Sequence, residues 1–230
     1  MLSFSFAKKP LSLCCKHGGI LVRVFACMAS TLDGKIGPAN VEQFVSIGSR
    51  YDLDHLKSLR DTADGVLFGA STFRAWPKVH HGHKADHQLH HFILSHSLDL
   101  DPNADLFQRT DIPVSIFTGA KPSLFLKEFP AQVKFIHLNN QKSTIVQTVD
   151  HIKQQGVTNL LVEGGGQVLQ QLIEAQILQE LFLTVTPKVM GQVDAPNLFG
   201  NMSTIKPPVF KTIDSKIVGD EVYFHFLLQY

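Results

Sequence analysis

The chain has 230 residues, of which 44% are apolar. This is enough to bury the core of one large domain and excludes an intrinsically disordered protein. Its 21 Lys and Arg residues face 20 Asp and Glu residues, for a formal charge of +1, so the chain lacks the basic excess that favours nucleic acid or an anionic membrane surface. The longest apolar stretches, such as residues 24–28, are far shorter than the roughly 20 residues that span a bilayer. We therefore expect neither a nucleic-acid partner nor a membrane-spanning segment.

The three cysteines are Cys14, Cys15 and Cys27, and the sequence holds no Cys-x-x-Cys pair. They cannot build a disulfide framework, and this usage favours a reducing cytoplasm. Residues 1–19 lack acidic side chains and faintly resemble a transit peptide, but such peptides favour arginine over the lysines found here. We expect residues 1–19 to form a poorly ordered extension and residues 20–230 to form a single cytoplasmic domain.

From residue 20 onward, short apolar runs alternate with stretches of helical periodicity, which indicates a layered α/β fold. Six runs are short, apolar and bounded by turn residues, and they predict buried strands. They are Ile20–Ala29, Gly65–Gly69, Phe92–Ser95, Val114–Thr118, Val133–Leu138 and Leu160–Glu163.

Two stretches predict helices by their periodicity. Apolar residues share one helical face over 145–152, with Ser143 as the expected N-cap and Gly156 as the stop. A second helix is expected after Gly166, where an apolar stripe would pack on the sheet.

The C-terminal part has a different pattern, in which β-like runs follow one another without a helical stretch between them. After a β-like run at Leu181–Thr186, two further runs, Phe210–Asp214 and Glu221–Leu228, flank the turn dipeptide Gly219–Asp220. They predict a terminal antiparallel hairpin. The fold class expected from all these elements is a three-layer α/β protein, whose mixed sheet is mostly parallel and ends in this hairpin.

The most informative segment is Leu160–Gln167, in which a buried strand runs through three glycines, Gly164, Gly165 and Gly166, into a helix. A helix N-terminus offers unpaired N–H groups, and glycine lets a pyrophosphate approach the backbone. The motif is not the standard dinucleotide fingerprint, because Leu169 stands where the third glycine belongs. On local sequence alone, a glycine turn needed only for tight packing remains an alternative.

Glu163 ends the buried strand beside this glycine run. A carboxylate there is costly unless a ligand or a neighbour satisfies it, although an acidic residue is also favourable near the start of a helix. Two further clusters follow predicted strands, Ala29–Ile36 with the dipeptide Asp33-Gly34, and Gly69–Arg74. Ligands bind at such strand ends, but Asp33-Gly34 is also an ordinary turn. The second cluster is no nucleophile elbow, since Phe73 stands where glycine is required.

Six histidines lie between Val79 and Phe92. No tetrahedral ligand spacing stands out and only Asp86 could assist them, so we expect no metal. We expect instead a solvated loop beside the mouth of the active site.

Four separated segments resemble the reductase of riboflavin biosynthesis, which in bacteria is the C-terminal domain of a bifunctional deaminase-reductase with a dihydrofolate-reductase-like fold. The similarity covers roughly residues 20–228. The matching segments are Thr31–Lys35, Asp64–Gly69 leading to Thr72, Val162–Gly166 and Pro187–Gly191.

The resemblance implies an NADPH-dependent homodimeric enzyme that reduces 5-amino-6-(5-phosphoribosylamino)uracil, a small molecule, to its ribitylamino form. Residues carried over for the cofactor are Ser30, Thr72, Gly164, Gly165 and Gly166, and Thr118 and Gln167 are further cofactor candidates. Arg60 and Glu163 would meet the substrate, and Asp33 and Glu163 are the candidate catalytic residues. By position, Thr118 and Lys121 are candidates for the 2′-phosphate of the cofactor.

The chain also departs from the family. It reads Phe73–Lys78 where many members have an acidic pair before a proline, and Cys27 where bacterial members often have a lysine. The zinc deaminase signature is missing, so deamination would belong to another chain. Two alternatives therefore stay open: a reductase of another pyrimidine, pterin or small heterocycle, and a nucleotide-binding module without turnover.

Overall fold

The computed structural model describes residues 22–40, 45–120, 128–202 and 207–230. The predicted extension at 1–19, with Cys14 and Cys15, lies outside these ranges. The strands are β1 (Arg23–Ser30), β2 (Gly65–Gly69), β3 (His90–Leu94), β4 (Val114–Thr118), β5 (Val133–His137), β6 (Asn159–Val162), β7 (Glu180–Val185), β8 (Val209–Val218) and β9 (Glu221–Gln229). The helices are α1 (Arg50–Arg60), α2 (Ala70–Ala75), α3 (Asp105–Gln108), α4 (Thr144–Gln154) and α5 (Gly166–Glu174).

Within the described ranges, the strands form one nine-stranded sheet in the order β5-β4-β3-β2-β6-β1-β7-β9-β8. All pairings from β5 to β7 are parallel, whereas β9 runs antiparallel to both β7 and β8. The prediction of a mostly parallel sheet with a C-terminal antiparallel hairpin is therefore confirmed. β1 lies between β6 and β7, which places the end of the first strand beside the glycine-rich turn that follows β6.

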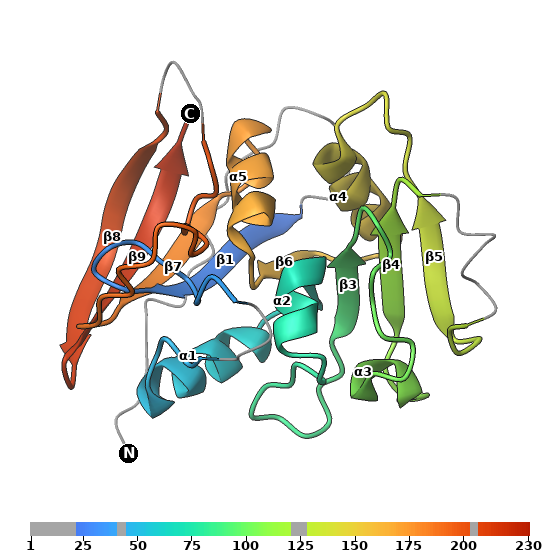
Figure 1. Cartoon of the computed structure of the whole chain (residues 1–230), viewed down its shortest axis with the longest axis horizontal. Coiled ribbons are helices and arrows are strands. Elements are labelled where there is room, and N and C mark those ends of the chain that lie inside the picture. The colour runs from blue at the N-terminus through green and yellow to red at the C-terminus, as the bar shows by residue number, and fades with distance from the viewer. Residues whose placement is uncertain (1–21, 41–44, 121–127, 203–206) are drawn as a thin grey trace.

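Helices cover both faces of the sheet (Figure 1). Alternate residues of β1 point to opposite faces: Ala26 packs with the apolar side of α4 and α5, and Phe25 packs with α1, α2 and α3. The apolar stripe of α5, with Val168, Leu169 and Leu172 buried, contributes about 1.5–3 kcal/mol for each side chain removed from water. This gives the three layers expected from the sequence. In the described part of the chain, no helix has the length and apolar character that a bilayer crossing requires.

Several element boundaries agree closely with the sequence pattern. β2 and β4 have the predicted bounds, and α4 begins directly after its N-cap residue Ser143. The Ser143 side chain makes no capping hydrogen bond, however. β8 extends to Val218, beyond the predicted Asp214, and continues through an irregularity between Thr212 and Asp214 before the predicted turn.

The histidine-rich segment is the expected exposed loop only in its middle, where His81, His83 and residues 84–86 are exposed; its two ends are buried, which the sequence did not predict. His80 and His91 are only 4% and 1% exposed, and β3 begins at His90, before the predicted Phe92. The His80 ring stacks on Phe68 with 4.5 Å between centroids. Imidazole rings can pack against aromatic side chains in a core, as His80 does on Phe68, so counting histidine as polar misplaced the start of this strand.

Candidate active site

The carboxyl ends of β1, β2, β3 and β6 border a cleft of about 1520 Å³. Open parallel sheets bind ligands at this edge, outside the carboxyl ends of their strands. Two groups of residues line the cleft. One is built around the turn between β6 and α5, and the other comes from β1, α1 and the segment before β3.

The glycine turn forms the wall at the start of α5. Gly164 has φ +97°, a conformation that favours glycine, and a Cβ there would lie 2.9 Å from Cε of Met28. A Cβ at Gly165 would meet only Oγ1 of Thr72, at 3.4 Å. A Cβ at Gly166 would overlap the carbonyl oxygen of Asn197. The first and third glycines are therefore required by the fold, whereas Gly165 leaves open space beside the N-terminus of α5.

Only some of the predicted cofactor residues line the cleft. Thr72, Gly165, Gly166 and Gln167 do so. Ser30, Thr118 and Gly164 are not among the described residues that line it. The buried Thr118 hydroxyl accepts a hydrogen bond from the N–H of Ala120 at 3.1 Å, and Lys121 lies outside the described ranges. The cofactor roles of all these residues stay predictions.

Glu163, directly after β6, forms a buried ion pair with Arg60 at the end of α1. Nε and Nη2 of Arg60 donate to Oε1 and Oε2 of Glu163, both at 2.7 Å. Nδ1 of His80 lies 2.6 Å from Oε2. Burial alone would raise the pKa of the Glu163 carboxyl, but the guanidinium and the imidazole outweigh it and hold this pKa well below its ordinary value. Glu163 is therefore ionised at neutral pH.

A second histidine, His91, binds the backbone of His80. Nδ1 of His91 lies 2.9 Å from the carbonyl oxygen of Leu89, to which it donates, so its Nε2 accepts from the backbone N–H of His80 at 3.0 Å. Burial lowers the pKa of His91 to about 3, which keeps this ring neutral. In the described structure, Nε2 of His80 is buried without a hydrogen-bond partner.

The structure thus brings together Arg60 and Glu163, the two predicted substrate residues, but as partners of each other. Their side chains are 8% and 6% exposed, and both residues line the cleft. The guanidinium fork is occupied by the carboxylate, so in this arrangement Arg60 does not present it to a phosphate. Their predicted contact with substrate is not tested by this geometry.

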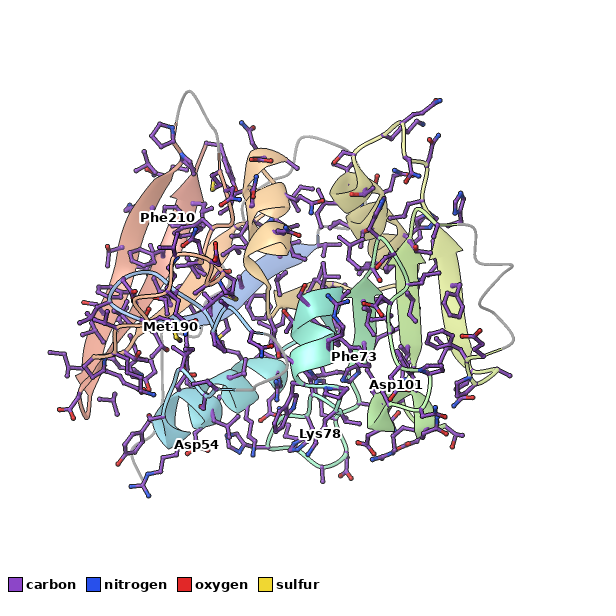
Figure 2. All side chains as sticks on the ribbon, in the orientation of Figure 1. Asp54, Phe73, Lys78, Asp101, Met190 and Phe210 are labelled. Carbon is purple, nitrogen blue, oxygen red and sulfur yellow. The ribbon has the colours of Figure 1, made fainter. Side chains whose placement is uncertain are left out.

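Asp33 joins the turn after β1 to the loop after β7, and its predicted proton-relay role stays a prediction. Its carboxylate accepts from the hydroxyl of Thr31 at 2.5 Å and from the backbone N–H groups of Met190 and Gly191 at 3.0 and 2.8 Å. The Thr31 hydroxyl, followed by these amides, lowers the pKa of Asp33. Met190 marks the loop after β7 in Figure 2. Asp33 joins two loops, and it is absent from the described residues that line the cleft.

One face of α1 lines the cleft and was not predicted from the sequence. Ser49, Asp52, Leu56 and Arg60 all line the cleft, at a spacing that places them on one side of a helix. Ser49 is the N-cap, and its side chain accepts from the N–H of Tyr51. A serine followed three residues later by an acid is a helix-start signal that could have indicated this element.

Both departures from the family pattern lie in this cleft. Cys27, on β1, lines it, and burial raises the pKa of its thiol well above the ordinary value. Trp76, which follows α2, also lines it and is 38% exposed, with Nζ of Lys78 4.9 Å from the centre of a ring. Among the described residues, no group of three or more His, Cys, Asp or Glu side chains could hold a metal ion.

Comparisons with known proteins agree on one family. Over 184 residues the chain is 26% identical to the riboflavin biosynthesis protein PYRR, chloroplastic, of Arabidopsis thaliana, covering 77% of this chain and 30% of that protein. A pyrimidine reductase-like protein of Corynebacterium diphtheriae has a similar structure, with a TM-score of 0.79, 20% identity and coverage of 91% and 92% of the two chains.

Dihydrofolate reductase of Enterococcus faecalis, solved with NADP(H), shares the fold with a TM-score of 0.52 and 13% identity, over 90% of this chain and 97% of that one. The predicted dihydrofolate-reductase-like fold is therefore confirmed. The chain spans less than a third of the Arabidopsis relative. The family model of the RibD C-terminal domain matches residues 22–224. This match covers most of the sequence, and the chain belongs to the RibD C-terminal domain family.

Proposed function

We propose that this protein is an NADPH-dependent reductase that converts 5-amino-6-(5-phosphoribosylamino)uracil to its ribitylamino form in riboflavin biosynthesis. Family membership supports this function, and so does the similarity to a plant riboflavin biosynthesis protein. The observation that carries the proposal is the open position at Gly165, beside the N-terminus of α5 and inside the large cleft.

The residues around Gly165 fit a dinucleotide. The first turn of α5 offers backbone N–H groups and the positive end of the helix dipole, which suit a pyrophosphate. Thr72 adds a hydroxyl across from Gly165, and Gln167 adds an amide on α5. When bound, the cofactor supplies a hydride, and the task of the protein is to hold the accepting carbon against it in a dry cleft.

The other part of the cleft suits the phosphoribosylamino-pyrimidine. Arg50 and Lys57 of α1 line it and bring positive charge toward a substrate phosphate. The ion pair of Arg60 with Glu163 gives this wall a fixed arrangement of donors and acceptors. His80 binds Glu163, and His91 binds the backbone of His80. The ion pair is therefore held in place before the substrate binds, and binding would not need to rearrange it.

The test is the oxidation of NADPH by purified protein, followed by absorbance with and without the proposed substrate, with the ribitylamino product identified by mass spectrometry. We expect oxidation only when both are present, and slower turnover with NADH. Binding of NADPH without turnover of this substrate would contradict the proposal.

Trp76 and Cys27 in the cleft favour a second candidate, a reductase of another pyrimidine, pterin or small heterocycle. An indole ring in the wall can stack on a flat heterocycle. Oxidation of NADPH with dihydrofolate or another pterin, and none with the phosphoribosylamino-pyrimidine, would select this candidate. NADPH binding without turnover of any heterocycle would leave only a nucleotide-binding module.

We also propose that the enzyme works as a homodimer in the cytoplasm, without a nucleic-acid or membrane partner. The outer strand β8 supports the dimer, because it leaves one edge of the sheet unpaired within the described chain. The cysteine usage and the balanced charge support the compartment and the absence of polyanionic partners.

A further inference from the structure

Asp52 is a cleft residue of α1 that neither the sequence motifs nor the proposed cofactor site uses. It lies in the first turn of the helix, on the same side as Ser49, Leu56 and Arg60, and all four line the cleft. Its carboxyl group therefore faces the space between α1 and the carboxyl end of β1, in which we place the substrate.

The Asp52 carboxyl does not cap the N-terminus of α1. In a capping box, the acid three residues after the N-cap accepts from the N-cap backbone N–H. Here Glu221 of β9 takes that place, because its Oε1 accepts from the N–H of Ser49 at 2.7 Å and its Oε2 from the Ser49 hydroxyl at 2.7 Å. Gly48 makes room for Asp52, since a Cβ on Gly48 would overlap the Asp52 carboxylate.

The surroundings of Asp52 favour its protonated form. Burial raises the pKa of the Asp52 carboxyl to about 6; a hydrogen bond with Thr184 opposes the shift, and the charge of Glu221 adds to it. The groups that face it are the Cys27 thiol on β1, Thr184 on β7, and Glu221 and Tyr223 on β9. The helix dipole at the first turn of α1 favours the ionised form, so burial is the stronger effect.

Other acidic groups of the cleft are poorly suited to give up a proton at neutral pH. Glu163 is ionised and paired with Arg60. The pKa of the Cys27 thiol is raised well above its ordinary value by burial. Asp194, a further carboxyl among the described lining residues, is exposed to water on its loop. Asp52 is the carboxyl whose burial and position both match a proton donor.

We propose that Asp52 is the general acid that opens the ribose ring of the substrate. This inference rests on the proposed reductase function. Asp52 gives its proton to the ring oxygen, the bond from that oxygen to C1′ breaks, and the nitrogen lone pair forms a C=N bond to C1′. That carbon then accepts the hydride of NADPH, which leaves as NADP⁺. The substrate gains one proton and one hydride, and the Asp52 carboxylate regains a proton from water.

The test compares wild type with Asp52→Asn, which keeps the size of the side chain and an oxygen that can accept from Thr184. We expect kcat to fall by about a hundredfold or more, with the Kd of NADPH unchanged by fluorescence titration. In wild type, kcat/KM should decline as pH rises above about 6, because Asp52 loses its proton. The variant should not show this decline. Carbon NMR of the free protein should show one aspartate carboxyl titrating near that pH.

Two further variants make the result decisive. Gly48→Ala should displace the carboxyl without changing its chemistry, and lower kcat by about tenfold with normal NADPH binding. Asp54→Asn, an exposed carboxyl on the same helix (Figure 2), should behave as wild type. Wild-type turnover in folded Asp52→Asn would overturn the role of Asp52 and leave the reductase function intact. A wild-type protein that binds NADPH but never turns over this substrate would overturn both.

Discussion

Gly165 and Gly166 are adjacent glycines that are needed for different reasons. A side chain at Gly166 would overlap the carbonyl of Asn197, so this glycine lets the 197–200 segment pack on the start of α5. Gly165 has φ −77° and room for a Cβ, so neither its φ nor a steric clash requires glycine. Under the proposed function, a glycine there lets the pyrophosphate of the cofactor approach the backbone.

Substitution of Gly165 tests this distinction. We expect Gly165→Val to weaken NADPH binding by about 2 kcal/mol, or roughly thirtyfold in Kd, because its methyl groups occupy the place of the pyrophosphate. The melting temperature should change little. Gly166→Ala, the matched control, should lower the melting temperature through the clash with Asn197. Equal NADPH affinity in folded Gly165→Val would remove the cofactor from this turn.

Glu163→Gln tests the buried ion pair. The new amide group would place a donor against the donors of Arg60 or His80, so we expect the free energy of unfolding to fall by roughly 3 kcal/mol. Because the folded-state pKa of Glu163 is depressed, its contribution to stability is complete above its ordinary pKa of about 4.5 and is lost as pH falls below that value. The stability difference between wild type and variant should therefore shrink in acid.

Glu174→Gln, on the exposed last turn of α5, is the control for chemical denaturation of both proteins. A folded Glu163→Gln variant that matches wild type in stability but loses turnover would favour a direct contact with substrate, as the family resemblance implies.

The sequence pointed to Arg60 and Glu163 as individual residues but did not reveal their partnership. They are 103 positions apart, and only the packing of α1 beside the end of β6 brings them together. His80 was hidden for the same reason, since its burial depends on Phe68 and His91. Local sequence shows which side chains are chemically able to act, whereas the contacts among distant segments decide which of them meet.

The turn after β1 is held to the loop after β7 by the carboxylate of Asp33. We expect Asp33→Asn to speed hydrogen exchange of the Met190 and Gly191 amides, because a neutral side chain with one acceptor replaces a carboxylate that serves both. The NADPH affinity should be unchanged. Asp220→Asn, in the β8–β9 turn, is the control. Loss of turnover with unchanged amide exchange would instead support the proton-relay role that the sequence suggested for Asp33.

Regular elements were predictable where the apolar pattern is uninterrupted. β2 and β4 are short apolar runs between turn residues, and their sequence bounds match the structure. α1 is harder to recognise, because of its eleven residues only His55, Leu59 and Arg60 are buried. Several of its other residues line the cleft instead of packing in the core. The hydrophobic periodicity of the sequence therefore says little about where α1 lies.

The sheet ends in the exposed strand β8. Ile217 and Val209 are 73% and 58% exposed on it, and an unpaired edge of this length invites association. If this edge forms the proposed dimer, Ile217→Lys should convert a dimer into a 25.6 kDa monomer in light scattering. Val189→Lys, on the exposed loop after β7, should remain dimeric. A wild-type protein that is monomeric at all working concentrations would contradict the proposed assembly.

Trp76 is the single tryptophan of the chain, and it lies in the wall of the cleft. Its emission therefore comes from one place in the molecule, without a background from other indole rings. Reduced nicotinamide absorbs in the range where indole emits, so a bound cofactor would quench Trp76 by resonance energy transfer. The protein thus carries its own optical reporter, with which occupancy of the cleft can be followed during a single turnover without any added label.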